Sequence, residues 1–206
     1  MFAEMRSVLG IPKTTDILDH IYQLPTEPQQ AEAMQAIRNI ESTAMASQVA
    51  QPGLSTLISY LDSRGVRKGI CTRNFDAPVN HLLNTFVPDS VFHPIVTREF
   101  RPPKPNPAGI LHIAKKWGLT SEAGFGKPVA ADATGLIMVG DSIDDMTAGR
   151  LAGAATVLLT NEVNRHLVEH EHTDLVISRL DELVDILEEG FQGREVVPGE
   201  TSEATS

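Results

Sequence analysis

The stretch from Leu136 to Met146 constrains the fold most, because an apolar run passes through one glycine into a pair of carboxylates. Residues 136–139 are continuously apolar, which is typical of a parallel strand covered on both faces. Gly140 ends this strand, so Asp141 is expected at its carboxyl end and Asp145 in the first turn of the next helix. In an open α/β sheet, ligands bind at this edge.

Two interpretations of these acids are open. The pattern Ser142-x-x-Asp145 is a capping box, and acidic residues are common in a first helical turn. Capping does not, however, require Asp141. Two carboxylates in one crevice repel each other unless a cation or a proton lies between them, and Mg²⁺ prefers such oxygen ligands. A helix cap and a magnesium site are both consistent with the residues.

The chain from residue 51 onward alternates between helix and strand patterns. Strands are expected at 66–71, 91–96, 136–139, 155–159 and 174–177, and helices at 54–61, 77–86, 107–117, 143–151 and 180–187, with a short helix near Val163. Residues 119–136, rich in glycine and alanine, indicate a surface loop. Repeated units of this size predict an α/β fold with a parallel sheet, right-handed crossovers and helices on both faces.

Residues 2–50 are helical in character. Helices are expected at 2–9, closed by Gly10, from Thr14 or Thr15 through Leu24, and along a longer run after Pro28. Helices of this size bury little by themselves and need to fold over something else. The expected organisation is a helical unit at 1–50, an α/β core at 51–189 and a polar, disordered tail at 190–206.

The amino-acid composition restricts the classes of molecule that the protein is expected to bind. The net charge of −10, with no basic run, argues against nucleic acid and anionic membrane surfaces, so a small molecule is the expected partner. Cys71 is the one cysteine; it fits a buried, inert thiol in a reducing compartment. The sequence contains no run long enough to span a membrane and no signal peptide, which predicts a cytoplasmic chain. It carries no signal of oligomeric state.

Two more motifs are expected at the same edge of the sheet. Thr72, Arg73 and Asn74 follow a strand and together can hold an oxyanion, although polar residues often end strands. Lys104 lies among four prolines, which hold its backbone rigid and pre-orient a cation suited to phosphate. The spacing of Pro102 and Pro105 also fits a polyproline ligand, but the segment lies between sheet elements rather than in a tail.

The order of these motifs resembles the haloacid dehalogenase (HAD) superfamily of hydrolases, in its phosphoglycolate-phosphatase-like branch, over roughly residues 2–188. The resemblance implies that Thr72 binds the transferring phosphoryl group and that Lys104 neutralises its charge. It also implies that Asp141 and Asp145 hold Mg²⁺, and that residues 1–50 form a cap that selects the substrate. The implied activity is a Mg²⁺-dependent phosphatase of a small phosphorylated metabolite.

One motif of that superfamily has no match here. Its members begin with a strand ending in Asp-x-Asp-Gly-Thr, whose first aspartate attacks phosphorus; the nearest strings start at Asp16 and Asp132 and follow no strand. Met1 falls where the cap should begin, so the expectation is an amino-terminally shortened chain, inactive as given, that binds Mg²⁺ weakly. Any organellar targeting segment would have been lost with the missing part.

The resemblance also places the missing strand in the centre of the sheet, between the strands at 66–71 and 136–139. An open slot between those strands is therefore expected, with a loosely packed protein around it. Two alternatives to the hydrolase stay open. One is a non-catalytic HAD-like protein that binds a phosphorylated ligand or a partner, and the other is a phosphomutase of the same superfamily.

Overall fold

The computed structural model describes residues 1–121 and 130–193, so parts of the expected loop at 119–136 and of the expected tail lie outside the described residues. The chain divides into two compact units. The first comprises Met1–Ala50 and Asp76–Pro88, and the second comprises Gln51–Phe75 and Asp89–Ser206.

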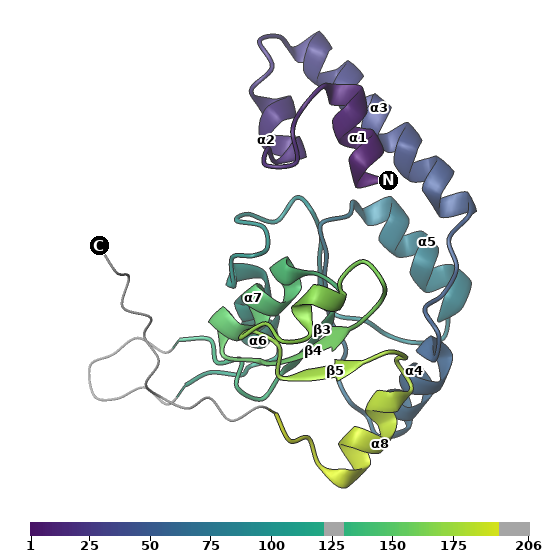
Figure 1. Cartoon of the computed structure of the whole chain (residues 1–206), viewed down its shortest axis with the longest axis vertical. Coiled ribbons are helices and arrows are strands. Elements are labelled where there is room, and N and C mark those ends of the chain that lie inside the picture. The colour runs from purple at the N-terminus through teal and green to yellow at the C-terminus, as the bar shows by residue number, and fades with distance from the viewer. Residues whose placement is uncertain (122–129, 194–206) are drawn as a thin grey trace. The chain divides into compact units, whose positions relative to one another are not determined.

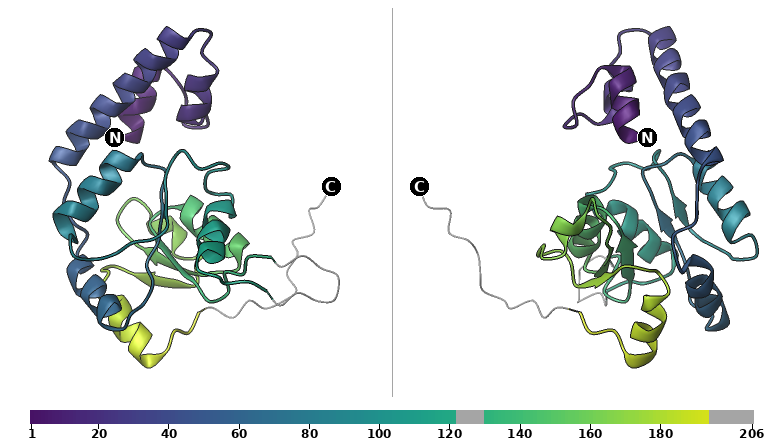
Figure 2. Two further views of the ribbon diagram at one scale, coloured as in Figure 1. Left: turned by 180° about the vertical axis from the view of Figure 1, so that it is seen from behind. Right: turned by 45° about the vertical axis from the view of Figure 1, so that its right-hand side comes forward.

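The first unit consists of helices. They are α1 (Phe2–Leu9), α2 (Ile17–Tyr22), α3 (Glu27–Ala46) and α5 (Asp76–Phe86). Figure 2 shows α1 and α2 beside the long α3, and both pack against it, as does α5. The side chains of Met5, Ile17, Leu18, Ile21 and Ile37 are fully buried in this unit. No helix within the described residues is both long and apolar enough to cross a membrane.

Two details of the first unit differ from the sequence predictions. The helix predicted from Thr14 or Thr15 is capped instead by Asp16, whose carboxylate accepts hydrogen bonds from the amides of residues 18 and 19 at 2.9 and 3.1 Å. An aspartate here also complements the positive end of the helix dipole, which a threonine cannot do. This helix ends at Tyr22 rather than Leu24.

The helix predicted at 77–86 was assigned to the α/β core, but α5 clusters with the first fifty residues because it packs along α3. Its apolar face, which includes the buried Pro78 and Val79, predicts that this side of the helix is covered. The pattern does not identify the element that covers it. The first unit is therefore built from two separate stretches of the chain.

The second unit has the predicted α/β architecture. Its strands are β1 (Ile70–Cys71), β2 (Ile95–Val96), β3 (Ile137–Gly140), β4 (Ala155–Leu159) and β5 (Leu175–Ile177). Its helices are α4 (Leu54–Ser63), α6 (Ala108–Lys116), α7 (Ile143–Ala152) and α8 (Glu182–Glu189), with a short 3₁₀ helix at Arg165–Leu167. The pairs β1–β2, β3–β4 and β4–β5 are parallel, which confirms the predicted parallel sheet; Figure 1 shows β3, β4 and β5.

The strands form two separate sheets, β1–β2 and β3–β4–β5, and no described strand lies between β1 and β3. The expected gap is therefore present. β1 is shorter than the strand predicted at 66–71, although the Lys68 carbonyl still accepts a hydrogen bond from the His93 amide. Pro94 lies opposite this region and has no N–H to donate, which interrupts the ladder.

Helices cover both faces of the larger sheet. On one face, α6 and α7 contribute Ile110, Ala114 and Ala148 to a buried cluster against which Met138 packs. On the other face, Leu57 of α4 and Leu183 of α8 pack with residues of β4 and β5. This three-layer arrangement, with apolar residues on both faces of each strand, explains the continuous apolar runs in the sequence.

The close approach of α7 to the sheet depends on Gly149. A Cβ atom at this position would lie 2.8 Å from Thr156 Cγ2 and 2.9 Å from Met138 Cβ. We expect Gly149→Ala to lower the free energy of unfolding by about 1–2 kcal/mol, because overpacking outweighs the better helix propensity of alanine. Urea denaturation would measure the change. Gly135→Ala, where a Cβ meets nothing within 4 Å, should alter stability little; equal losses in both variants would contradict the packing argument.

Candidate active site

Asp145 occupies the centre of the rim formed where the strands of the second unit end. Its Oδ2 accepts hydrogen bonds from Ser142 Oγ at 2.8 Å and from the amides of Ser142 and Asp141 at 3.2 Å each. Ser142 Oγ in turn accepts from the Asp145 amide, so the predicted capping box is formed. A side chain at Gly140 would collide with Asp145, which explains the glycine that ends the strand.

Lys104 connects this cap to the other sheet. Its Nζ donates to the Cys71 carbonyl at 2.6 Å and forms an ion pair with Asp145 Oδ1. The side chains of Lys104 and Asp145 are both 9% exposed, so the pair is shielded from solvent. One ammonium group thus ties the end of β1 to the first turn of α7, and it brings together two residues that the sequence analysis selected separately.

Asp141 follows β3 directly, and its backbone amide donates to Asp145. Partial burial of the carboxyl group raises the pKa of Asp141 above its usual range, and the nearby negative charge of Asp145 raises it further. This is the electrostatic conflict expected of two carboxylates that share one crevice. A cation placed near Asp141 would relieve it.

Thr72 lies at the end of β1, where its amide donates to the Val96 carbonyl at 2.8 Å. Its hydroxyl oxygen accepts from the Asn74 amide at 3.1 Å, which leaves the hydroxyl proton for donation to a ligand. Asn74 is held in turn, because its carbonyl accepts from the Arg98 amide at 2.9 Å. The backbone after β1 therefore fixes Thr72 as a hydrogen-bond donor at the rim.

Arg73 forms an ion pair with Asp144, in the first turn of α7. This is a second link between the β1 end and α7, parallel to the link made by Lys104. The sequence analysis proposed Arg73 as an oxyanion ligand and did not identify this pairing. In the structure its guanidinium is directed to a carboxylate of the chain itself.

Asn164 is a rim residue that the sequence analysis missed. It is 5% exposed, and its Nδ2 donates to the carbonyls of Asp141 at 2.8 Å and Leu159 at 2.9 Å. Its Oδ1 accepts from the Asn161 amide at 2.6 Å. Asn164 thereby fixes the backbone of Asp141 against the end of β4. The one signal for it in the sequence is an amide residue shortly after a strand, which is common in loops.

The rim offers a limited set of oxygen ligands to a cation such as Mg²⁺. Within residues 1–121 and 130–193, no group of three or more histidine, cysteine, aspartate or glutamate side chains is placed to hold a metal. Mg²⁺ in proteins commonly keeps several waters and uses one or two carboxylates plus substrate phosphates. Asp141 fits that mode of binding, whereas both oxygens of the adjacent Asp145 already accept hydrogen bonds from Lys104 and from the cap.

Comparison with known proteins identifies relatives over most of the chain. A family model described as a haloacid dehalogenase-like hydrolase matches residues 4–153. An uncharacterized hydrolase of Saccharomyces cerevisiae is 44% identical over 191 residues, which cover 91% of this chain and 82% of the yeast protein. A phosphoglycolate phosphatase of Nitrosococcus oceani is 27% identical over 175 residues, covering 83% of this chain and 72% of that protein.

Solved structures show the same fold. The crystal structure of CbbY from Rhodobacter sphaeroides in complex with phosphate matches with a TM-score of 0.65 and 17% identity, covering 87% of this chain and 85% of that chain. A predicted phosphoglycolate phosphatase from Haemophilus somnus matches with a TM-score of 0.63 and 18% identity, covering 82% of this chain and 71% of that chain.

The buried ion pair at the rim should be far more sensitive to mutation than an exposed one. Lys104→Met leaves Asp145 buried without its partner, so we expect a loss of about 3–5 kcal/mol in the free energy of unfolding. Adding Asp145→Asn should restore part of that loss. Arg64→Met, which removes an ion pair to Glu188 between side chains 56% and 46% exposed, should cost less than about 1 kcal/mol. Similar losses in Lys104→Met and Arg64→Met would contradict the shielding of the rim pair.

Proposed function

The chain belongs to the haloacid dehalogenase-like hydrolase family, and from that premise we propose that its rim binds the phosphate group of a small phosphorylated metabolite together with Mg²⁺. The reaction class of the family is hydrolysis, and a phosphate ester is the substrate class that we propose for this rim. The relative from Nitrosococcus oceani is a phosphoglycolate phosphatase, which supports a small phosphorylated acid as the substrate class.

The observation that carries this proposal is the position of Lys104. Its ammonium group lies where β1 ends, bonded to the Cys71 carbonyl and to Asp145, with Thr72 as the next residue of the chain. A fixed cation beside a directed hydroxyl and a pair of carboxylates combines the groups that bind a phosphate and its counter-cation.

The proposed roles follow from these contacts. Thr72 donates its hydroxyl proton to a phosphate oxygen, and Lys104 offsets the negative charge of the phosphate. Asp141, with Asp145 beside it, would hold Mg²⁺, and the bound ion would supply positive charge that stabilises the phosphate group. Arg73 is paired with Asp144, and its role in this proposal is to position the rim. Asn74 acts through the Thr72 hydroxyl.

Phosphoryl transfer through an aspartyl-phosphate needs a carboxylate free to attack phosphorus. Among the described residues, we count three carboxylates at the rim, those of Asp141, Asp144 and Asp145. Asp145 is bound by Lys104 and the cap, Asp144 by Arg73, and Asp141 is assigned to the cation. We therefore propose that the 206-residue chain binds phosphate without turning it over. A phospholigand-binding protein is the second candidate, and this occupation of the three carboxylates favours it.

Phosphate binding tests the site directly. We expect the purified chain to bind inorganic phosphate in isothermal titration calorimetry, more tightly with Mg²⁺ present. Thr72→Val should weaken this binding by about 10- to 100-fold, because it removes a hydrogen bond to a charged group. Thr43→Val, whose hydroxyl bonds the backbone of its own helix, is the matched control and should bind normally. Equal phosphate binding by both variants would remove Thr72 from the site.

Hydrolysis tests the assignment of the carboxylates. The chain should release no phosphate from p-nitrophenyl phosphate above background in Mg²⁺. A fusion that places an apolar strand ending in Asp-x-Asp-Gly-Thr ahead of Met1 should gain turnover, and Asp141→Asn in the fusion should abolish it. Turnover by the unfused chain, lost in Asp141→Asn, would show that the described residues already supply the nucleophile.

A further inference from the structure

The loop that follows β4 contributes a buried amide to the rim. Asn164 is 5% exposed, although its neighbours in the loop on both sides are exposed. A polar side chain is stable in a buried position only when its donors and acceptors are bonded. Asn164 meets this condition, because its Nδ2 donates to the carbonyls of Asp141 and Leu159 and its Oδ1 accepts from the Asn161 amide.

This side-chain amide extends the sheet beyond the end of its ladder. The last residue pair of the β3–β4 ladder is Gly140 and Leu158. One residue further along, the carbonyls of Asp141 and Leu159 accept from Asn164 Nδ2 at 2.8 and 2.9 Å. Two carbonyls cannot bond each other, so a donor between them is required. Asn164 supplies that donor and joins the end of β3 to the end of β4.

Asn164 is itself held by the loop and by the core. Asn161 Oδ1 accepts from the Asn164 amide at 3.1 Å, and Asn164 Oδ1 accepts from the Asn161 amide at 2.6 Å, so the two asparagines bond each other in both directions. The Asn164 carbonyl accepts from the Leu167 amide at 2.9 Å, and Leu167 is buried with Met146 and Leu158. The packed part of the second unit therefore fixes the position of the Asn164 side chain.

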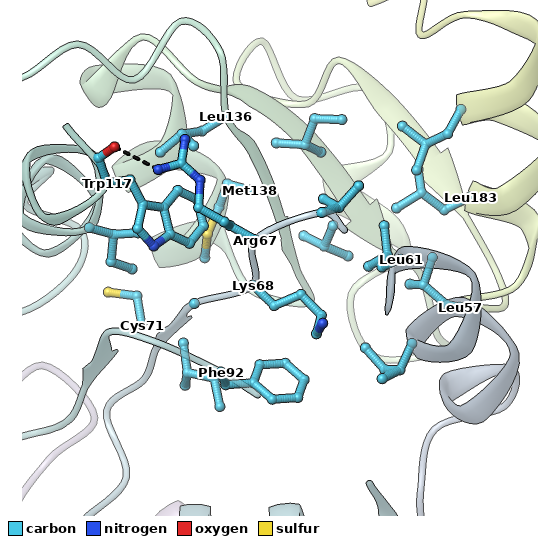
Figure 3. A pocket seen from close by; sticks show the side chains of 18 of the residues that line it. Leu57, Leu61, Arg67, Lys68, Cys71, Phe92, Trp117, Leu136, Met138 and Leu183 are labelled. Atoms are coloured by element: carbon cyan, nitrogen blue, oxygen red, sulfur yellow. Dashed lines mark hydrogen bonds between the residues drawn. The ribbon is translucent and has the colours of Figure 1, made fainter. Parts of the chain in front are cut away.

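The opposite edge of β3 offers the end of this strand no comparable support. There β3 borders a cavity of about 900 Å³, and Figure 3 shows Leu136 and Met138 on its wall. Within residues 1–121 and 130–193, the one strand that pairs with β3 is β4. The backbone that leaves β3 is therefore held from the β4 side and by the cap of α7.

The backbone of Asp141 is held on both sides of its Cα atom. The amide before it donates to Asp145 Oδ2 at 3.2 Å, and the carbonyl after it accepts from Asn164. With both flanking peptide planes held, the backbone angles of Asp141 are set, and they set the direction in which its carboxylate leaves the chain. Both oxygens of Asp145 already accept hydrogen bonds, so a cation at the rim depends most on the Asp141 carboxylate.

We propose that Asn164 is a positioning residue for cation binding, because its bridge between the Asp141 and Leu159 carbonyls holds the Asp141 carboxylate where a divalent cation can bind. Asn164 does not coordinate the cation, since its own polar atoms are bonded to the chain. Replacing a side chain that orients a metal ligand commonly lowers metal affinity by about 10- to 100-fold. This inference rests on the proposed function, since it takes the rim to be a cation site.

Manganese binding tests the inference. Mn²⁺ prefers the same oxygen ligands as Mg²⁺, and electron paramagnetic resonance measures the free ion directly. Asp141→Asn removes the ligand, and the affinity that it loses defines the binding at the rim. We expect Asn164→Ala to bind Mn²⁺ at the rim at least about tenfold more weakly than the unmodified chain, because the Asp141 carbonyl loses its donor and the backbone after β3 gains freedom.

Thr173→Val is the matched control. Thr173 is 1% exposed, and its Oγ1 donates to the Leu167 carbonyl at 3.0 Å, so this variant also removes a buried hydrogen bond to a carbonyl of the same loop. Neither the side-chain hydroxyl nor the amide of Thr173 bonds Asp141. We expect Thr173→Val to lose stability in urea denaturation, as Asn164→Ala does, and to bind Mn²⁺ as the unmodified chain does.

Phosphate binding separates positioning from a general loss of structure. In the proposed site, phosphate without a cation is bound by Thr72 and Lys104, which Asn164 does not bond. Asn164→Ala should therefore bind inorganic phosphate normally in calorimetry without a divalent cation, and should lose the increase in affinity that Mg²⁺ gives the unmodified chain. Equal weakening with and without Mg²⁺ would show that Asn164 only supports the fold, and would overturn the inference.

The manganese titration also separates this inference from the proposed function. If Asp141→Asn lowers Mn²⁺ affinity and folded Asn164→Ala does not, the inference fails and the cation site stands. If Asp141→Asn leaves Mn²⁺ binding unchanged, the cation site fails and the inference fails with it. Should Asn164→Ala not fold, Asn161→Ala takes its place, because it removes from an exposed position the acceptor that holds the Asn164 amide. Weaker Mn²⁺ binding by Asn161→Ala would then support the inference, and unchanged binding would overturn it.

Discussion

The carboxylate of Asp145 accepts hydrogen bonds from the turn that follows β3 and pairs with Lys104, and the geometry of the whole rim depends on these two roles. Through its Oδ2 it sets the start of α7 and the direction in which Asp141 leaves the strand. Through its Oδ1 it fixes a lysine that also bonds the end of β1. Burying a charged pair is favourable only when the remaining donors and acceptors are satisfied, and here the cap supplies those hydrogen bonds.

The rim is thus held by side chains where sheet hydrogen bonds are missing. Two ion pairs, from Lys104 and Arg73, tie the end of β1 to α7, whereas no ladder joins β1 and β3 within residues 1–121 and 130–193. A cavity of about 900 Å³ has room for many water molecules, each of which needs roughly 30 Å³, so the free strand edges can be solvated. Solvation spares the edges the penalty of a buried unpaired donor, but it leaves apolar walls in contact with water.

The features that could be predicted from the sequence are those set by residues close together in the chain. A cap acts within four residues, so the pattern Ser142-x-x-Asp145 and the strand before it were sufficient to predict the β3–α7 junction. Ion pairs between distant segments cannot be predicted in this way. Asp141, Asp144 and Asp145 lie within five residues and differ only in the direction in which each side chain leaves the start of the helix. Lys104 pairs with Asp145 and Arg73 with Asp144, and nothing in the local pattern distinguishes these partners. The same holds for α5, whose amphipathic pattern predicts burial but not the helix against which it packs.

The hydrogen bonds and the ion pair of Asp145 also limit how the proposed site could hold a cation. Its Oδ2 already accepts from three donors of the cap and its Oδ1 from Lys104, so the carboxylate with most freedom to coordinate is that of Asp141. A divalent cation held mainly by one carboxylate and water binds weakly. A phosphate at Thr72 and Lys104 would add oxygen ligands that the chain itself lacks, so each of the two would strengthen the binding of the other. Thermodynamic linkage makes this coupling reciprocal. In the proposed site, cation and phosphate would therefore bind cooperatively, with Lys104 as a second positive charge beside the phosphate.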